Sequence, residues 1–320
     1  MSLCPPKKYN ELFVFDEVDI LKRHSMIKII GVGKFGSDVV ESINRAELHD
    51  IDFITVNQGQ KKLSNDLAPL QNGVRDIERF HIDSDSPTLE RQIYDILGEN
   101  ITLVFVVSNL EEGYSSIISA ICHHVHVIES IDGNQVAFAL LKKTGGDNEM
   151  NTTGREIVEA ITSEATKVMF FDGTNDLSQT SYSTIDYVSQ NIIGVIRIVC
   201  KTFIDYEYCC IDYNDVATVL QSGTKAIYST AEGKGGDRGK KAAMELKQNI
   251  ESQGYKMEDV KNMLLLMSFS RLHIPTVEEC SIITDSLNDY IGEYATVLWN
   301  ASNDVPEDSD SIVFSSIVLV

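Results

Sequence analysis

Three closely spaced glycines, Gly31, Gly33 and Gly36, are the residues of this chain best suited to binding a phosphate. They follow a short β-branched run that begins at Met26, and a helical pattern of apolar residues comes after them. Glycine permits a tight strand-to-helix turn and lets backbone N–H groups approach a phosphate at the helix N-terminus. The spacing matches a dinucleotide-binding fingerprint, which is a weak signal unless the rest of the chain supports it.

Two other segments imitate known chemical motifs without completing them. Cys122 and His126 have the i, i+4 spacing of two metal ligands on a helix, but no second cysteine lies near them in the sequence. We expect no metal site there, since histidine is also favoured at the C-terminal end of a helix. The segment Gly233–Lys241 lacks the glycine spacing of a P-loop and is interpreted as a flexible basic loop leading into a helix. No hydrolytic triad is indicated.

The composition excludes several classes of partner. The net charge of −21 argues against nucleic-acid binding, which needs clustered Lys and Arg, and against docking on an anionic membrane. No apolar run is long enough to cross a bilayer, so direct membrane insertion is not expected. Six cysteines without paired zinc-ligand spacing, and no signal peptide, predict reduced thiols in a cytoplasmic protein.

From Met26 onward, strand patterns alternate with helical patterns, which predicts an α/β fold with a mostly parallel sheet. The expected strands are Ile27–Gly31, Ile51–Val56, Leu103–Ser108, Gln135–Leu141 and Lys167–Phe171. The expected helices between them are Ser37–Ala46, Thr88–Leu97, Ser115–His126 and Gly154–Ser163.

A long helical pattern from Thr180 to Asp205 suits a central helix between two halves of the molecule. A second α/β unit follows, with strands at Lys225–Thr230, Asn262–Ser268, Tyr294–Asn300 and Ser311–Leu319 and helices at Gly239–Ser252 and Thr276–Gly292. We therefore divide the chain into an N-terminal extension (1–25), a Rossmann-like GTPase-type domain (26–179), a central helix (180–205) and a C-terminal α/β activation-type domain (206–320).

This order of elements, with particular residues in them, resembles the bacterial cell-division protein FtsZ and the wider tubulin superfamily over roughly residues 26–320. Four segments carry the resemblance: Ile27–Gly33 as first strand and phosphate loop, Ile51–Asn57 as second strand, Thr102–Ser108 as the strand before the glycine-rich signature loop, and Ile211–Leu220 as synergy loop and following helix.

The resemblance implies GTP or GDP, with Mg²⁺ for hydrolysis, at the C-terminal ends of the parallel strands. It also implies head-to-tail filaments in which one subunit's synergy loop completes the site of the next. Asp212 and Asp215 match the two acidic synergy-loop positions acting in trans, although an isolated pair with this spacing is more often a helix cap. The implied nucleotide-binding residues are Gly31, Gly33, Gly36, Gly113, Ser115, Ser116, Arg155, Tyr187 and Asn191.

Several residues depart from the family pattern. Of the run of glycines and threonines in the family's signature loop, this chain clearly retains Gly113 alone. Glu111 and Glu112 precede a helix N-terminus, where phosphates normally bind. A carboxylate there satisfies the helix dipole and repels a triphosphate, and we favour this substitution over the alternative that these residues hold Mg²⁺.

Other departures concern neighbouring positions of the implied site. Lys34 and Phe35 replace glycines, Cys210 replaces an asparagine of the synergy loop, and Asn191 replaces an aspartate that reads guanine. Tyr187 matches an aromatic residue that stacks on the purine, and Arg155 is either a phosphate- or ribose-facing residue or a solvated one.

We therefore expect an FtsZ-like cytoskeletal protein that assembles into cytoplasmic filaments with weakened or altered GTP binding and hydrolysis. Two alternatives remain within the family: an active GTPase with rebuilt phosphate loops, or a non-polymerising scaffold or regulator. A Rossmann dehydrogenase is disfavoured because the second strand ends Val56-Asn57-Gln58 without the acidic residue that binds ribose. A protein adaptor could bind an unidentified surface, for example within residues 1–25.

Overall fold

The computed structural model describes residues 26–43, 48, 50–58, 77–82, 87–98, 101–132, 135–143, 152–165, 167–172, 186–204, 211, 213–221 and 226–320; for a few helical residues among these it describes the backbone alone. The predicted extension over residues 1–25 lies outside this part of the chain.

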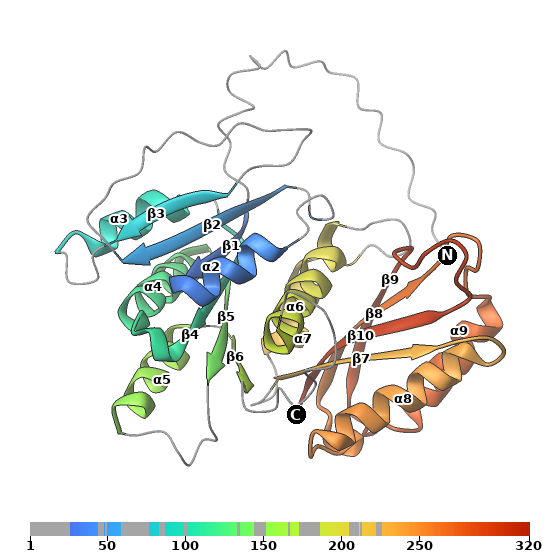
Figure 1. The fold of residues 1–320 in the computed structure, drawn as a ribbon. Coiled ribbons are helices and arrows are strands. Elements are labelled where there is room, and N and C mark those ends of the chain that lie inside the picture. The colour runs from blue at the N-terminus through green and yellow to red at the C-terminus, as the bar shows by residue number, and fades with distance from the viewer. Residues whose placement is uncertain are drawn as a thin grey trace.

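A six-stranded parallel sheet forms the first half of the fold (Figure 1). Its strands lie in the order β3-β2-β1-β4-β5-β6. In β1, β2, β4 and β5 the side chains are buried on both faces because helices cover both sides, which explains the continuous apolar runs in the sequence. The strand bounds are β1 (Ile27–Val32), β2 (Ile51–Gln58), β3 (Glu78–Ile82), β4 (Leu103–Asn109), β5 (Val136–Lys143) and β6 (Lys167–Asp172).

The two faces of this sheet support separate hydrophobic cores. On one face, Ile30 and its neighbours pack against α3 (Leu89–Leu97), α4 (Ser115–Asp132) and α5 (Thr152–Glu164). On the other face, Ile29 and its neighbours pack against α2 (Gly33–Ser42) and the central helix α6 (Tyr187–Ile204). Successive residues of a strand point to opposite faces, so this alternation places each helix on its own side.

A four-stranded mixed sheet forms the second half, in the order β7-β10-β8-β9. Strand β10 runs antiparallel to both β7 and β8, and β9 runs parallel to β8. The helices α8 (Arg238–Ser252) and α9 (Val277–Asn288) cover one face, and α6 and α7 (Tyr213–Gln221) pack against the other. The strand bounds are β7 (Ala226–Gly233), β8 (Asn262–Phe269), β9 (Thr296–Ser302) and β10 (Ile312–Leu319).

The central helix α6 joins the two sheets, and Figure 1 shows it between them. Its apolar side chains share one core with both sheets, because Ile192 and Val195 cluster with Phe105 of β4 and Leu266 of β8. Gly194 lets the Tyr228 ring of β7 approach closely, since a Cβ at Gly194 would lie 2.2 Å from the tyrosine hydroxyl. A buried Lys201 on α6 forms an ion pair with Asp304, which follows β9.

The structure confirms the α/β class, the parallel first sheet and the second unit, and it adds three details. Strand β3 was not predicted, since its five residues carry only a weak alternating pattern. Helix α2 begins at Gly33 and not at Ser37, so Gly33 and Gly36 lie in its first turn, while Gly31 lies in β1. Helix α4 continues to Asp132, which places Cys122 and His126 in its middle and not at its C-terminal end.

None of the helices in the described part of the chain has both the length and the hydropathy needed to span a bilayer.

The packing of α3 on α4 predicts a pH dependence of stability through His124. Burial lowers the pKa of this imidazole; the Gly98 backbone hydrogen bond raises it and nearby His123 lowers it further. The other group facing the ring is Tyr94, which makes an edge-on contact at 5.7 Å, while His123 itself pairs with Glu164. The unfolded chain then binds the proton more readily, so the free energy of unfolding should fall as pH drops below about 6.5, by at most about 1.4 kcal/mol per pH unit.

Denaturation of the His124→Gln variant between pH 7.5 and 5 checks this expectation, because the variant should lose part of the acid-dependent destabilisation. The exposed His273→Gln change is the control and should leave the pH profile as in the wild type. An unchanged profile in the His124 variant would contradict the assignment.

Candidate functional site

The turn from β1 into α2 is held by contacts that only glycine allows. A Cβ on Gly31 would lie 2.2 Å from the Gly36 carbonyl oxygen, and a Cβ on Gly36 would lie 2.2 Å from the Val107 carbonyl oxygen of β4. Gly33, the first residue of α2, has a φ of +77°. The glycines therefore seat the start of α2 directly on the carboxyl ends of β1 and β4, which is where a helix N-terminus can offer its free N–H groups to an anion.

A second turn follows β4, the strand that pairs with β1, so the two turns lie beside each other at one edge of the sheet. It contains a 3₁₀ turn over Leu110–Glu112 and then Gly113 with a φ of +79°. The Asn109 side-chain oxygen accepts a hydrogen bond from the Glu111 N–H at 3.1 Å. Helix α4 then begins at Ser115, which is half-buried, and Ser116 is exposed.

The Glu112 carboxylate crosses from the second turn to the first. Its two oxygens lie 3.0 and 3.4 Å from the backbone nitrogen of Phe35 and accept its N–H in the first turn of α2. A Cβ on Gly33 would lie 2.2 Å from Glu112 Oε2 and 2.6 Å from the Tyr114 ring. The sequence predicts a carboxylate at the N-terminus of the helix that follows it, α4, whereas the structure places this one at the N-terminus of α2.

Cationic side chains also gather at this edge. Lys142, near the carboxyl end of β5, places its ammonium 4.9 Å from the centre of the Phe35 ring, a cation–π contact. Lys34 is exposed in the first turn of α2. Sequence reasoning missed Lys142, and its position at the end of a strand next to β4 is the signal that could have identified it.

The contacts of the two turns show whether a phosphate fits at the N-terminus of α2. The N–H groups of α2 and the neighbouring lysines have the right chemistry, but the Phe35 N–H donates to Glu112 and the space over Gly33 is filled. In this arrangement the site does not accommodate a phosphate at the α2 N-terminus.

Comparisons with known proteins concern the fold as a whole. No protein-family model and no curated protein sequence matches the chain. A mutant FtsZ from M. jannaschii matches with a TM-score of 0.69 and 12% identity, over 92% of this chain and 90% of that one. The chain has the fold of the FtsZ/tubulin superfamily.

Two further structures with the FtsZ/tubulin fold come from Haloferax volcanii. CetZ1, described as a GDP-bound monomer, matches with a TM-score of 0.62 and 13% identity, over 92% of this chain and 93% of that one. CetZ2, described as a GTPγS-bound protofilament, matches with a TM-score of 0.60 and 15% identity, over 92% of each chain. At these identities the likeness concerns the fold and confirms the resemblance seen in the sequence.

The remaining residues that the FtsZ/tubulin resemblance assigns to nucleotide binding lie on two helices. Tyr187 is the first residue of α6 and is 49% exposed, so its ring is open to a stacking partner. Asn191, one turn later, is half-buried. Arg155 lies in α5, and its side chain is outside the described part of the structure.

The acidic pair predicted to act on a neighbouring subunit is only partly described. Asp215 is exposed in the first turn of α7, while Asp212 lies outside the described residues. Helix α7 packs on β8, β9 and α6, so Asp215 is carried by the second sheet and the glycine turns by the first. A first-turn carboxylate is also favoured by the helix dipole, so the capping interpretation stays open.

The two segments that imitate chemical motifs in the sequence lie in the described part of the chain. No group of three His, Cys, Asp or Glu side chains there could hold a metal ion. Cys122 is buried, and burial, with Glu164 nearby, raises the pKa of its thiol to about 12. In the segment 233–241, Arg238 is buried in an ion pair with Glu279. A cleft of about 590 Å³ between α6 and the second sheet is lined by none of the glycine-turn residues.

Proposed function

We propose that this protein is an FtsZ-like cytoskeletal protein that assembles head to tail into cytoplasmic filaments, with weakened or altered GTP binding and hydrolysis. The observation that carries the proposal is a whole-chain FtsZ/tubulin fold in which the candidate groups are divided between two sheets, the glycine turns on the first and Asp215 on the second. Groups held apart in one subunit are suited to meeting across an interface between two copies, and a head-to-tail interface repeats without closing.

The names of the matched structures support self-association and nucleotide binding as the working hypothesis. An FtsZ from M. jannaschii is described as a dimer and CetZ2 as a protofilament, and the two CetZ structures are described with GTPγS or GDP bound. We propose that Gly31, Gly33, Gly36, Gly113, Ser115, Ser116 and Arg155 face the phosphates or ribose and that Tyr187 and Asn191 face the base. Asp212 and Asp215 would contact the neighbouring subunit's site.

The contact between Glu112 and α2 favours weakened binding over a rebuilt, fully active GTPase. A carboxylate already held by a backbone N–H has lost part of its capacity to hold Mg²⁺, and it places negative charge where a phosphate would come. The selectivity for guanine should also weaken, because Asn191 offers one neutral acceptor where a carboxylate would offer two charged oxygens.

Assembly with GTP, with GDP and without nucleotide tests the proposal by sedimentation, electron microscopy and phosphate release. We expect filaments, and Asp215→Asn should lower any assembly-dependent phosphate release by about tenfold, which corresponds to about 1.4 kcal/mol of the barrier. Asn214→Ala is the matched control, since Asn214 is an exposed neighbour on the same turn. A monomer under every condition would overturn the filament proposal and leave the scaffold alternative.

A further inference from the structure

We propose that the segment Leu110–Tyr114 is a built-in plug whose Glu112 carboxylate takes the place of a phosphate at the N-terminus of α2, so that seating of the plug and binding of an anion exclude each other. This inference rests on the proposed function, because it assumes that the glycine turns form the nucleotide site. It specifies how that site is regulated.

The first support is that the plug uses both the donor and the space that an anion would need. The Phe35 N–H donates to the Glu112 carboxylate at 3.0 Å, which is the bond a phosphate oxygen would otherwise accept. Glu112 Oε2 and the Tyr114 ring fill the volume over Gly33, where even a single Cβ would lie 2.2 and 2.6 Å from them. The Glu112 carboxylate and the Tyr114 ring, which come from the same short segment, thus occupy the space that an anion would need.

The second support is that the plug has defined ends. On one side, Ser108 at the end of β4 donates to the Val32 carbonyl of β1 at 2.9 Å, and the Asn109 side chain accepts the Glu111 N–H. On the other side, Gly113 has a φ of +79°, and nothing lies within 4 Å of the position that a Cβ would take, so the backbone is unpacked on that side. We expect the part between these points, which carries Glu112, to move while β4 and α4 keep their places.

The third support is the contrast between two adjacent carboxylates. Glu112 is half-buried against α2, whereas Glu111 is exposed. Both carry the same formal charge within one turn, so long-range repulsion of a phosphate should be similar for the two. A difference between their variants therefore reports the contact with α2 and not the local net charge.

Hydrogen exchange at the Phe35 amide, measured without nucleotide, tests the plug directly. In Glu112→Ala this amide should exchange about fivefold faster, and the affinity for inorganic pyrophosphate and for GTP should rise about fivefold, because a competing occupant of the site has been removed. Glu111→Ala should leave exchange at the Phe35 amide unchanged, and it should raise the affinity only by the smaller amount that the long-range charge contributes. Glu112→Gln keeps the shape of the side chain without its charge and serves if the alanine variant does not fold.

The wild-type chain provides a measurement that needs no variant. Pyrophosphate titrated into it should speed exchange at the Glu111 amide, which Asn109 holds while the plug is seated. Unchanged Phe35 exchange in the Glu112 variants, or faster exchange with no gain in pyrophosphate affinity, would overturn the inference. Filament formation separates the two proposals: variants that bind pyrophosphate more tightly but never assemble contradict the proposed function alone.

Discussion

The Lys28→Met variant is expected to lose about 3–5 kcal/mol of its free energy of unfolding. Lys28 and Asp52 are register partners on the adjacent strands β1 and β2, and the ammonium lies 2.7 Å from the carboxylate. Both side chains are buried, with 0% and 1% of their surface exposed. Removing the lysine takes the counter-charge away from a buried carboxylate, and breaking a buried ion pair by removing one member is strongly destabilising.

Chemical denaturation followed by circular dichroism measures this loss. The double variant Lys28→Met with Asp52→Leu is the control, because an apolar pair of similar volume avoids the cost of desolvating two ions and should recover most of the stability. A single variant that loses less than about 1 kcal/mol, or a double variant whose loss equals the sum of the two single losses, would contradict this account of the pair.

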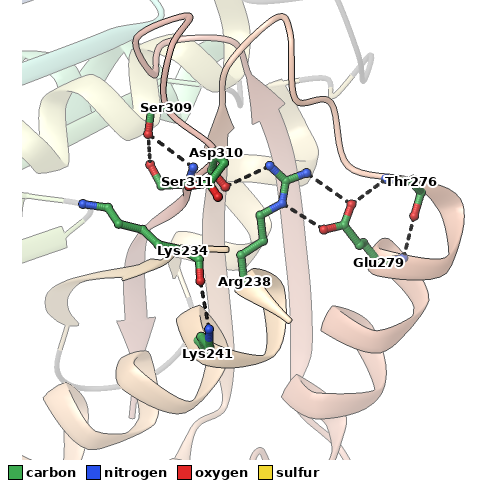
Figure 2. Close-up of polar contacts among 8 residues, drawn as sticks. All are labelled: Lys234, Arg238, Lys241, Thr276, Glu279, Ser309, Asp310 and Ser311. Atoms are coloured by element: carbon green, nitrogen blue, oxygen red, sulfur yellow. Dashed lines mark hydrogen bonds and ion pairs between the residues drawn. The ribbon is translucent and has the colours of Figure 1, made fainter. Parts of the chain in front are cut away.

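The Arg238→Ala variant is expected to lose about 2–4 kcal/mol. Figure 2 shows this side chain at the start of α8, where its guanidinium contacts two separate segments. It donates to both Glu279 oxygens at 2.8 and 3.2 Å and to the Asp310 carbonyl at 3.1 Å. Arg238 therefore ties α8, α9 and the loop before β10 together, and alanine removes all three of these hydrogen bonds.

Two further measurements separate this role from a general loss of packing. Thr276→Ala, which removes the capping box that Glu279 completes at the start of α9, should cost only about 1 kcal/mol. The hydrogen bond from Arg238 lowers the pKa of Glu279, so its contribution is present above the unfolded pKa near 4.3 and is lost as pH falls. The Arg238 variant should show less acid destabilisation, and an unchanged pH profile would contradict the assignment.

Much of the fold could be predicted because its elements carry strong local patterns. The runs that became β1, β2, β4 and β5 are largely apolar, as strands buried on both faces require, and helices alternate with them. The alternating pattern of β3 was too weak to predict a strand. The start of α2 at Gly33 could not be predicted either, because glycine has a low helix propensity. There, close packing on the strand ends outweighs the local preference.

The amino-acid sequence by itself determined the α/β class, the glycine turn at Gly31, Gly33 and Gly36, and the presence of two glutamates in the neighbouring loop. These features follow from composition and from spacings of a few residues, which local backbone physics can interpret. Only the tertiary structure decided where Glu112 goes. Its partner, the Phe35 N–H, is 77 residues away in the sequence, and the two meet because β1 and β4 pair side by side in one sheet. A hydrogen bond of that kind depends on strand order, which no local pattern contains.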